Sequence, residues 1–226
     1  MNFNDTDRKR INQFLETVSK SKINGLSTKD ELWSLTNSQT KALLDKIVAL
    51  NPKEYGFRGK QVPQESVPKD AIKIDNRTDN SSGEHELVNS AYLPKEVYRA
   101  FEKMAGVFSK EYPVRKLMVS SGYRSPAFQV LTLLYILAKI YDFDLSQTLK
   151  RVAMPQYSQH CSANNTAIDM LNIDGEPSDD EPEKFKDSIE YKWITENASK
   201  FNFYESYPSN NPDGIMWEPW HWQYIV

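Results

Sequence analysis

The sequence predicts an α+β fold, in which helices pack on a small, mainly antiparallel sheet. Apolar residues recur at helical spacing along several stretches of the chain, and these stripes predict the helices. Shorter apolar runs, such as "KLMVSSGY" and "TAIDML", predict buried strands in the second half. The segments "FNFYESY" and "WEPWHWQYIV" near the end are typical of two strands of one sheet. We expect this sheet domain over residues 61–226, with an N-terminal helical extension over residues 1–60.

The N-terminal part is predicted to be helical up to Pro52. Residues 5–21 form the first helix, with an apolar stripe of Ile11, Phe14, Leu15 and Val18. Ser27 with Asp30 resembles a capping box that opens a second helix, and the helical pattern then continues to about residue 50. Residues 51–90 are rich in proline and polar residues, so we expect irregular chain there, with a surface loop over 76–84.

The elements that follow alternate between helix and strand. Helices are predicted after Pro94, from Ser125-Pro126 to about Tyr141 and over 145–153. The helix after Pro94 has a stripe of Val97, Phe101, Met104, Ala105 and Phe108. Between these helices, "KLMVSSGY" is a strand that ends in Gly122, and "TAIDML" is a later buried strand. One amphipathic helix is predicted over "EPEKFKDSIEYKWITENASKF", with four residues inward: Phe185, Ile189, Trp193 and Ile194.

The composition is that of an ordinary soluble globular protein. The 226 residues are 39% hydrophobic and 26% charged, and the net charge of −3 gives no basic field for nucleic acid. The single cysteine, Cys161, excludes an intramolecular disulfide. We expect no signal peptide in this chain, because its first residues lack an apolar region, and no transmembrane segment, because "VLTLLYILAKIY" is too short.

His221 and Glu218 share one apolar segment, and Asp169 lies inside another. Asp169 interrupts the predicted strand "AIDML", where a carboxylate is costly unless it is paired or binds a cation. His160, Asp169 and His221 together offer an N, O, N set for one zinc ion. Three protein ligands leave a fourth position for water, as in catalytic zinc sites. Glu218 is then an additional acid, and we expect Pro219 to distort the strand so that Glu218 and His221 share a face.

Each of these residues also has a purely structural interpretation. A histidine in a buried strand can be hydrogen-bonded in the core, and Asp169 can cap an element or form a buried ion pair. Cys161 follows His160 directly, so in extended chain its thiol points away, and we expect no catalytic role for it. We assign no role to His85.

Three motifs in order carry a resemblance to a known family: "SSGYRSPAFQ", "YSQH…TAID" and "EPWHWQYI". They resemble the VanY-type D-alanyl-D-alanine carboxypeptidases, zinc peptidases that share a fold with the amidase domain of Hedgehog proteins. The resemblance covers residues from about 88 to the C-terminus. It implies a fold of the Hedgehog/D,D-peptidase type and action on peptidoglycan in the cell envelope.

The resemblance also implies a role for each matching residue. His160, Asp169 and His221 correspond to the zinc ligands, and Glu218 corresponds to the general base. Arg124 corresponds to the arginine that binds the substrate carboxylate. Two further positions, Gln129 and Ser158, match residues that line the substrate cleft.

The chain departs from the family between the first two ligands. The family separates its histidine and aspartate by seven positions and has a glycine between them, whereas His160 and Asp169 are nine positions apart without a glycine. We expect a two-residue bulge in which Asn164 or Asn165 adopts the left-handed conformation. The bulge is expected to alter substrate choice and to preserve the metal site.

The function implied by these observations is removal of a C-terminal D-alanine from peptidoglycan stem peptides by a zinc-dependent carboxypeptidase. Three alternatives stay open: an L,D-carboxypeptidase, a peptidoglycan endopeptidase of the same fold, and a non-catalytic zinc module that binds the cell wall. The roles of residues 1–60, the oligomeric state and the export route have no signal in the sequence.

Overall fold

A four-stranded antiparallel sheet contains two of the predicted site residues, Asp169 and His221. Its strand order is β3-β4-β6-β5, and the strands are β3 (Leu117–Ser121), β4 (Ala167–Asn172), β5 (Phe203–Glu205) and β6 (His221–Tyr224). Every pair of neighbouring strands is antiparallel. The two strands predicted at the end of the chain, β5 and β6, are therefore neighbours in one sheet. The predicted α+β class is confirmed.

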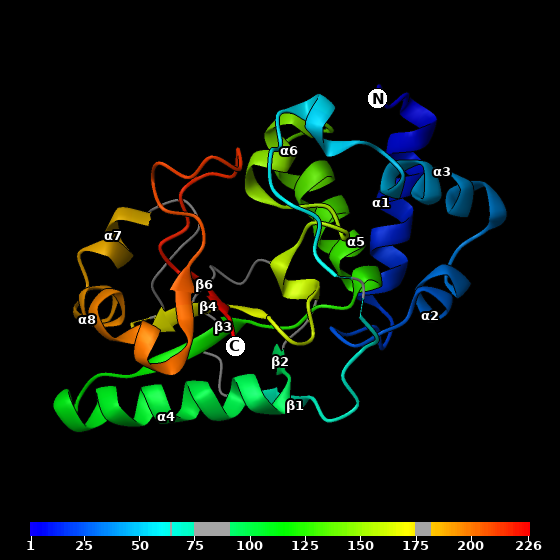
Figure 1. Cartoon of the computed structure of the whole chain (residues 1–226). Helices are drawn as coiled ribbons and strands as arrows, with labels where there is room; N and C mark the ends of the chain where they lie inside the picture. The colour runs from blue at the N-terminus through cyan, green and yellow to red at the C-terminus, as the bar shows by residue number, and fades with distance from the viewer. Residues whose placement is uncertain (64, 75–90, 175–181) are drawn as a thin grey trace. The chain divides into compact units, whose positions relative to one another are not determined.

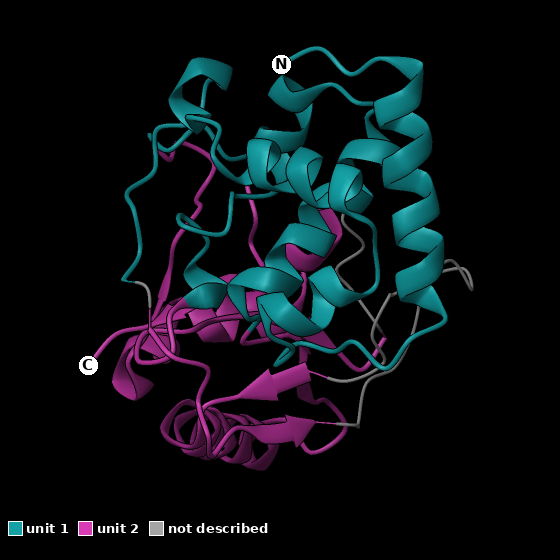
Figure 2. Cartoon of the chain, turned by 90° about the vertical axis from the view of Figure 1, so that its right-hand side faces the viewer, with its two compact units in different colours: residues 1–64, 124–161, 212–216 teal, residues 65–123, 162–211, 217–226 magenta. Residues whose placement is uncertain are grey.

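The computed structural model describes residues 1–63, 65–74, 91–174 and 182–226. The chain forms two compact units, each built from separate stretches of sequence (Figures 1 and 2). Unit 1 contains residues 1–64, 124–161 and 212–216, and unit 2 contains residues 65–123, 162–211 and 217–226. The loop expected over 76–84 and His85 lie outside the described residues. The domain boundary at residues 60–61 stays a prediction.

Unit 1 consists of helices and short helical turns among its described residues. They are α1 (Asp5–Ser19), α2 (Lys29–Ser34), α3 (Ser38–Val48), η1 (Pro52–Tyr55), α5 (Pro126–Tyr135), η2 (Ile136–Ile140), α6 (Leu145–Arg151) and η3 (Gln159–Cys161). The predicted stripe of α1 is buried, and Asn4 caps this helix through a reciprocal bond with Asp7. Ser125 caps α5 as predicted, because its hydroxyl accepts the amide of Phe128 at 3.0 Å.

The cap of the second helix was predicted one residue too early. Thr28 and Glu31 form the capping box of α2, rather than Ser27 and Asp30. The Ser27 hydroxyl instead accepts the amide of Asn24 at 3.1 Å, so it closes the preceding turn. Ser27 and Thr28 each carry a hydroxyl and have an acid three residues later, so both match the capping-box pattern. Only the backbone conformation shows which of the two is the cap.

Unit 2 places its hydrophobic core between the sheet and its helices. The helix α4 (Lys95–Glu111) runs along the sheet in Figure 1, and it buries four of its five predicted stripe residues: Val97, Phe101, Met104 and Phe108. The other helices of the unit are α7 (Pro182–Lys186), α8 (Ile189–Asn197) and η4 (Ala198–Phe201). Tryptophans from α8, from the turn before β6 and from β6 itself complete the core: Trp193, Trp220 and Trp222.

Two further predictions for unit 2 were wrong. The segment 182–201 is not one helix, because the Ser188 hydroxyl accepts the amide of Tyr191 at 3.0 Å and begins a new helix there. Ile189, predicted inward, is 44% exposed as a result. The stretch predicted to be irregular contains a strand, β1 (Ile72–Ile74), which pairs with β2 (Ala91–Leu93) in a small antiparallel sheet. Three residues are too few to give a periodic signal.

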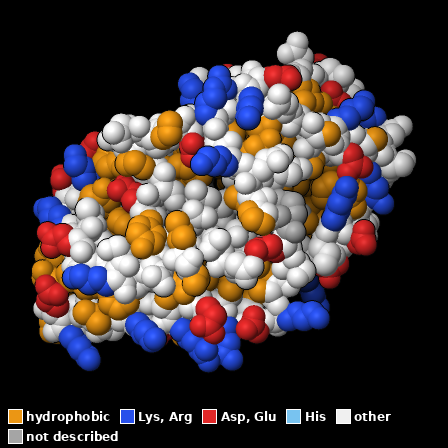
Figure 3. Space-filling view, viewed as in Figure 1, with side chains coloured by type: hydrophobic (Ala, Val, Ile, Leu, Met, Phe, Trp, Pro, Cys, Tyr) orange, Lys and Arg blue, Asp and Glu red, His pale blue; other side chains and the backbone are white. Residues whose placement is uncertain are grey.

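The surface carries charges of both signs. In the face shown in Figure 3, basic and acidic side chains lie interspersed, with apolar side chains between them. Over the described parts of the chain, no helix combines the length and the apolar character needed to cross a membrane.

Candidate metal centre

Asp169 and His221 face each other across two neighbouring strands. They are direct partners in the antiparallel pairing of β4 with β6, so their side chains lie on the same face of the sheet. The Asp169 Oδ1 atom lies 3.0 Å from the His221 Nδ1 atom. The side chains are only 14% and 5% exposed, respectively. The strand pairing thus explains how two residues 52 positions apart come into contact where little solvent reaches them.

Glu218 joins this pair from the turn that precedes β6. The amide of His221 donates to the carbonyl oxygen of Glu218 at 3.0 Å, so Pro219 and Trp220 occupy the middle of the turn. The Glu218 Oε2 atom then lies 3.6 Å from His221 Nδ1. Glu218 was expected within a distorted strand, but it lies just before the strand begins. The turn places it beside His221, which a regular strand would not do.

Tyr207 stacks against the His221 imidazole, a contact that the sequence did not predict. The two ring centroids are 4.7 Å apart and the rings are inclined by 37°. The backbone also links the segments, because the Ser206 amide donates to the His221 carbonyl at 3.3 Å and the Glu218 amide donates to the Tyr207 carbonyl at 3.0 Å. Tyr207 is 5% exposed, so it is a buried support for both acid and histidine. No motif marks this residue, because the contact depends on the pairing of β5 with β6.

His160 lies in the short 3₁₀ helix η3 of unit 1 and is 5% exposed. Its carbonyl oxygen accepts the backbone amide of Arg124 at 3.0 Å. The amide of Cys161 donates to the carbonyl of Ser158 at 2.9 Å, which closes the turn around the histidine. Two predicted motifs of the sequence are therefore hydrogen-bonded to each other within this unit.

The donor set suits a zinc ion. Asp169 and His221 offer a carboxylate oxygen and an imidazole nitrogen within unit 2, and His160 of unit 1 stays the predicted third ligand. Two imidazole nitrogens and one carboxylate oxygen are ordinary zinc ligands, with bonds of about 2.0–2.2 Å. Tetrahedral geometry with such bonds separates neighbouring ligand atoms by about 3.3 Å. The 3.0 Å between Asp169 Oδ1 and His221 Nδ1 is close to that separation.

Arg124 is held by the side chain of Gln129. The Arg124 Nη1 atom donates to Gln129 Oε1 at 3.1 Å, while Gln129 Nε2 donates to the carbonyl of Ala153 at 2.8 Å. Gln129 is 1% exposed, so its amide is fixed between the two partners. Gln129 thus orients the guanidinium of a half-buried arginine. The substrate-binding roles of Arg124, Gln129 and Ser158 stay predictions.

Cys161 is a buried, neutral thiol. Burial raises its pKa to about 12, although the charge of Arg124 and a hydrogen bond with Ser158 act in the opposite direction. A thiol with this pKa is protonated at neutral pH, and only the thiolate is a good nucleophile or metal ligand. Cys161 lies in the 3₁₀ helix η3 rather than in the extended chain that was expected, and the absence of a catalytic role for it stays a prediction.

The connection between His160 and Asp169 differs from its prediction. Within the part of the chain that the structure describes, the non-glycine residues with positive φ are Asp142, Phe143 and Asn202. Asn164 and Asn165 therefore do not adopt the left-handed conformation. The Ser162 hydroxyl instead accepts the amide of Asn165 at 3.1 Å, and a serine turn replaces the expected conformation.

The chain matches the VanY family, described as D-alanyl-D-alanine carboxypeptidase, over residues 90–226. It is 30% identical over 172 residues to a D-alanyl-D-alanine carboxypeptidase of Enterococcus faecium, covering 73% of this chain and 48% of that protein. The chain thus spans about half the length of this relative.

One solved structure has a similar fold. The structure of LdcB, an LD-carboxypeptidase described in terms of peptidoglycan recognition, has a TM-score of 0.55 at 24% identity and covers 77% of this chain and 78% of that one. A VanY D,D-pentapeptidase solved in complex with Zn(II) has a TM-score of 0.49 at 21% identity, covering 63% of this chain and 78% of that one. With its matched region spanning the three motifs, the chain belongs to the VanY family of D-alanyl-D-alanine carboxypeptidases.

Proposed function

We propose that this chain is a zinc-dependent carboxypeptidase that removes a C-terminal D-alanine from peptidoglycan stem peptides. The observation that carries the proposal is the buried Asp169–His221 pair, with the Glu218 carboxylate 3.6 Å from the histidine. Membership of the VanY family supports both the peptidase class and an action at the cell envelope.

In this proposal His160, Asp169 and His221 hold the zinc ion. When bound, zinc polarises a scissile carbonyl and makes a water molecule acidic enough to attack near neutral pH. The strand pairing fixes Asp169 and His221 before any ion arrives, so little conformational entropy is lost on binding. Tyr207 restricts the orientation of the His221 ring by stacking on it.

Glu218 is the general base. Its side chain is 11% exposed and belongs to a turn that is hydrogen-bonded at both ends, so its position is well defined. It accepts a proton from the attacking water and passes it to the leaving amine. A site with only a structural role does not need this additional acid, which argues against a non-catalytic module.

Arg124 recognises the free carboxylate at the C-terminus of the peptide. The planar guanidinium suits bidentate pairing with a carboxylate, and Gln129 orients it through a hydrogen bond from Nη1. Ser158, which is 3% exposed, supports the turn that contains His160. This arrangement makes the activity dependent on a free C-terminus.

Paired substrates test this function. Defined muropeptides that end in D-Ala-D-Ala, in L-Lys-D-Ala or in a C-terminal amide are incubated with the protein, and released D-alanine is measured by mass spectrometry. We expect release from the D-Ala-D-Ala acid and little from its amide. The Arg124→Ala variant should lower kcat/KM for the acid by about 10- to 100-fold, since a charge-assisted bond contributes about 1.5–3 kcal/mol.

Other outcomes separate the alternatives. Preferential cleavage of L-Lys-D-Ala would identify an L,D-carboxypeptidase, and cleavage of the amide as fast as the acid would identify an endopeptidase. Binding of muropeptides without release of any product would identify a non-catalytic module. Cleavage of the amide as fast as the acid would overturn the role given to Arg124, and binding without release would overturn the role given to Glu218.

A further inference from the structure

The connection between the first two ligands is held by an acid far away in the sequence. The Glu65 carboxylate accepts hydrogen bonds from residues 162–164, which lie 97 to 99 positions later in the chain. One oxygen, Oε2, accepts the amide of Ala163 at 2.5 Å and the amide of Asn164 at 3.0 Å, with the Ser162 hydroxyl at 3.4 Å. The other oxygen, Oε1, accepts the side-chain amide of Asn164.

This arrangement is a specific recognition of an anion by the backbone. Two successive amides that point at one carboxylate oxygen form a concave donor site for negative charge. Hydrogen bonds to an ionised acceptor are about twice as strong as neutral ones. Glu65 therefore fixes the backbone at Ala163 and Asn164 more firmly than the turn alone would fix it.

The far end of the same segment is fastened to the strand that carries His221. The side-chain amide of Gln223 donates to the carbonyl of Asn165 at 3.0 Å, and the backbone amide of Tyr224 donates to the carbonyl of Thr166 at 3.1 Å. The Thr166 hydroxyl also donates to the carbonyl of Ser162. The connection thus enters β4 in one defined conformation. Asp169 is the third residue of this strand.

We propose that Glu65 is a positioning residue for the metal centre. It holds the lengthened connection between His160 and Asp169 in place, where the shorter family connection relies on a glycine. Glu65 lies outside the matched region of residues 90–226, so membership of the family does not account for it. The inference rests on the proposed zinc site, because it assigns Glu65 an effect on that site.

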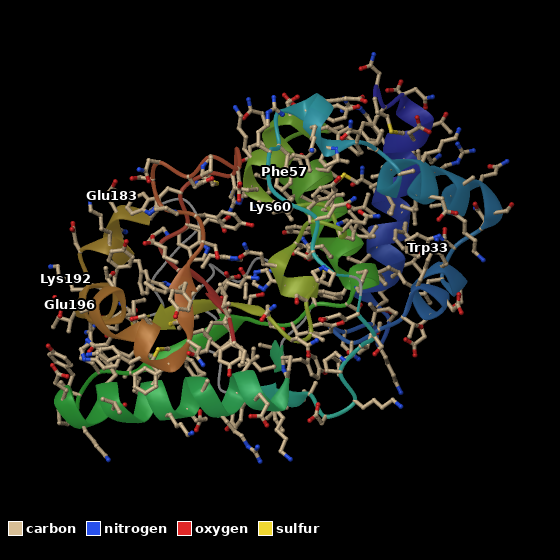
Figure 4. All side chains as sticks on the ribbon, viewed as in Figure 1. Trp33, Phe57, Lys60, Glu183, Lys192 and Glu196 are labelled. Atoms are coloured by element: carbon tan, nitrogen blue, oxygen red, sulfur yellow. The ribbon has the colours of Figure 1, made fainter. Side chains whose placement is uncertain are left out.

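Three variants of the full chain test this role. Glu65→Ala removes all the acceptors, and Glu65→Gln keeps one acceptor oxygen but loses the charge. The matched control is Glu196→Ala, because Glu196 is an exposed acid that projects outward from α8 in the same unit (Figure 4). Circular dichroism verifies that each variant is folded. If Glu65→Ala does not fold, Glu65→Gln alone is used to test the role.

The readouts are zinc affinity, measured by competition with a chromogenic chelator, and amide hydrogen exchange in the metal-free protein. We expect Glu65→Ala to weaken zinc binding by about 10-fold or more, as for residues that support metal ligands elsewhere, with Glu65→Gln intermediate. Exchange at Ala163 and Asn164 should accelerate by about 10- to 100-fold, because each amide loses a bond to a charged acceptor. Glu196→Ala should change neither quantity.

The results separate this inference from the proposed function. If the native protein binds zinc and both Glu65 variants keep its affinity and exchange rates, the role of Glu65 is wrong while the zinc site stands. If exchange accelerates but zinc affinity is unchanged, Glu65 stabilises the loop alone and the positioning role is also wrong. If the native protein binds no zinc at all, the proposed function fails as well.

Discussion

Glu218 is the residue whose position bears most directly on the proposed reaction. The turn ahead of β6 places its carboxylate beside His221, but no ligand role is needed from it. We expect Glu218→Gln to keep zinc and to lower kcat by about 10²–10⁴-fold, the usual effect of losing a general base. Steady-state kinetics and metal analysis of the same sample measure both quantities.

The matched control for this variant is Glu196→Gln, which removes a charge from an exposed site on α8 and should leave kcat unchanged. A Glu218→Gln protein that kept more than about a tenth of native kcat would show that another group accepts the proton.

The sequence could predict the residues whose chemical type is unusual for their surroundings. Asp169 interrupts an apolar strand, and His221 lies among tryptophans, so both attract attention without any structure. Tyr207 and Glu65 could not be predicted in this way. An aromatic residue near a strand and an acid in an irregular segment are both common, and their roles arise only from contacts between distant segments.

At the scale of elements, an ion pair joins α8 to the start of β3. Arg115 donates to both oxygens of Glu190, with Nε–Oε1 at 2.7 Å and Nη2–Oε2 at 3.0 Å, and its Nη1 lies 2.8 Å from Asp174 Oδ2. The Glu190 side chain is 0% exposed and that of Arg115 is 25% exposed. The hydrogen bond with Glu190 raises the pKa of Arg115, so the guanidinium remains charged.

We expect Arg115→Met to lower the free energy of unfolding by about 3 kcal/mol, because it leaves a buried carboxylate without its charged partner. Urea denaturation followed by tryptophan fluorescence measures this change. Arg99→Met is the control, because the Arg99–Glu96 pair has side chains 55% and 72% exposed and should contribute less than about 1 kcal/mol. Equal losses in the two variants would mean that the Arg115 pair does not tie α8 to the sheet.

The elements themselves were predicted with uneven success for physical reasons. Long stripes such as those of α1 and α4 give a strong periodic signal, and both helices are where the sequence places them. The break between α7 and α8 depends on a single serine cap, and β1 has only three residues. Neither feature changes the hydrophobic periodicity of the sequence enough to be recognised. Local signals also could not separate the caps Ser27 and Thr28.

At the scale of the whole molecule, each compact unit combines stretches that are far apart in the sequence. Residues 124–161 belong with the first 64 residues, and residues 217–226 belong with 65–123 and 162–211. The sequence alone predicts an N-terminal extension followed by one domain. Local periodicity contains no information on which distant segments pack together. The three motifs nevertheless identify the family, because they occur in the same order along the matched region.

The measurement that tests the central claim most directly is the response of D-alanine release to removal and return of zinc. The purified protein is treated with a chelator, dialysed, and assayed on a D-Ala-D-Ala muropeptide before and after one equivalent of Zn²⁺ is added, with His221→Ala in parallel. We predict that release stops without metal, returns with one equivalent per native chain, and does not return for His221→Ala. Release that continues at the native rate in metal-free protein would contradict the account.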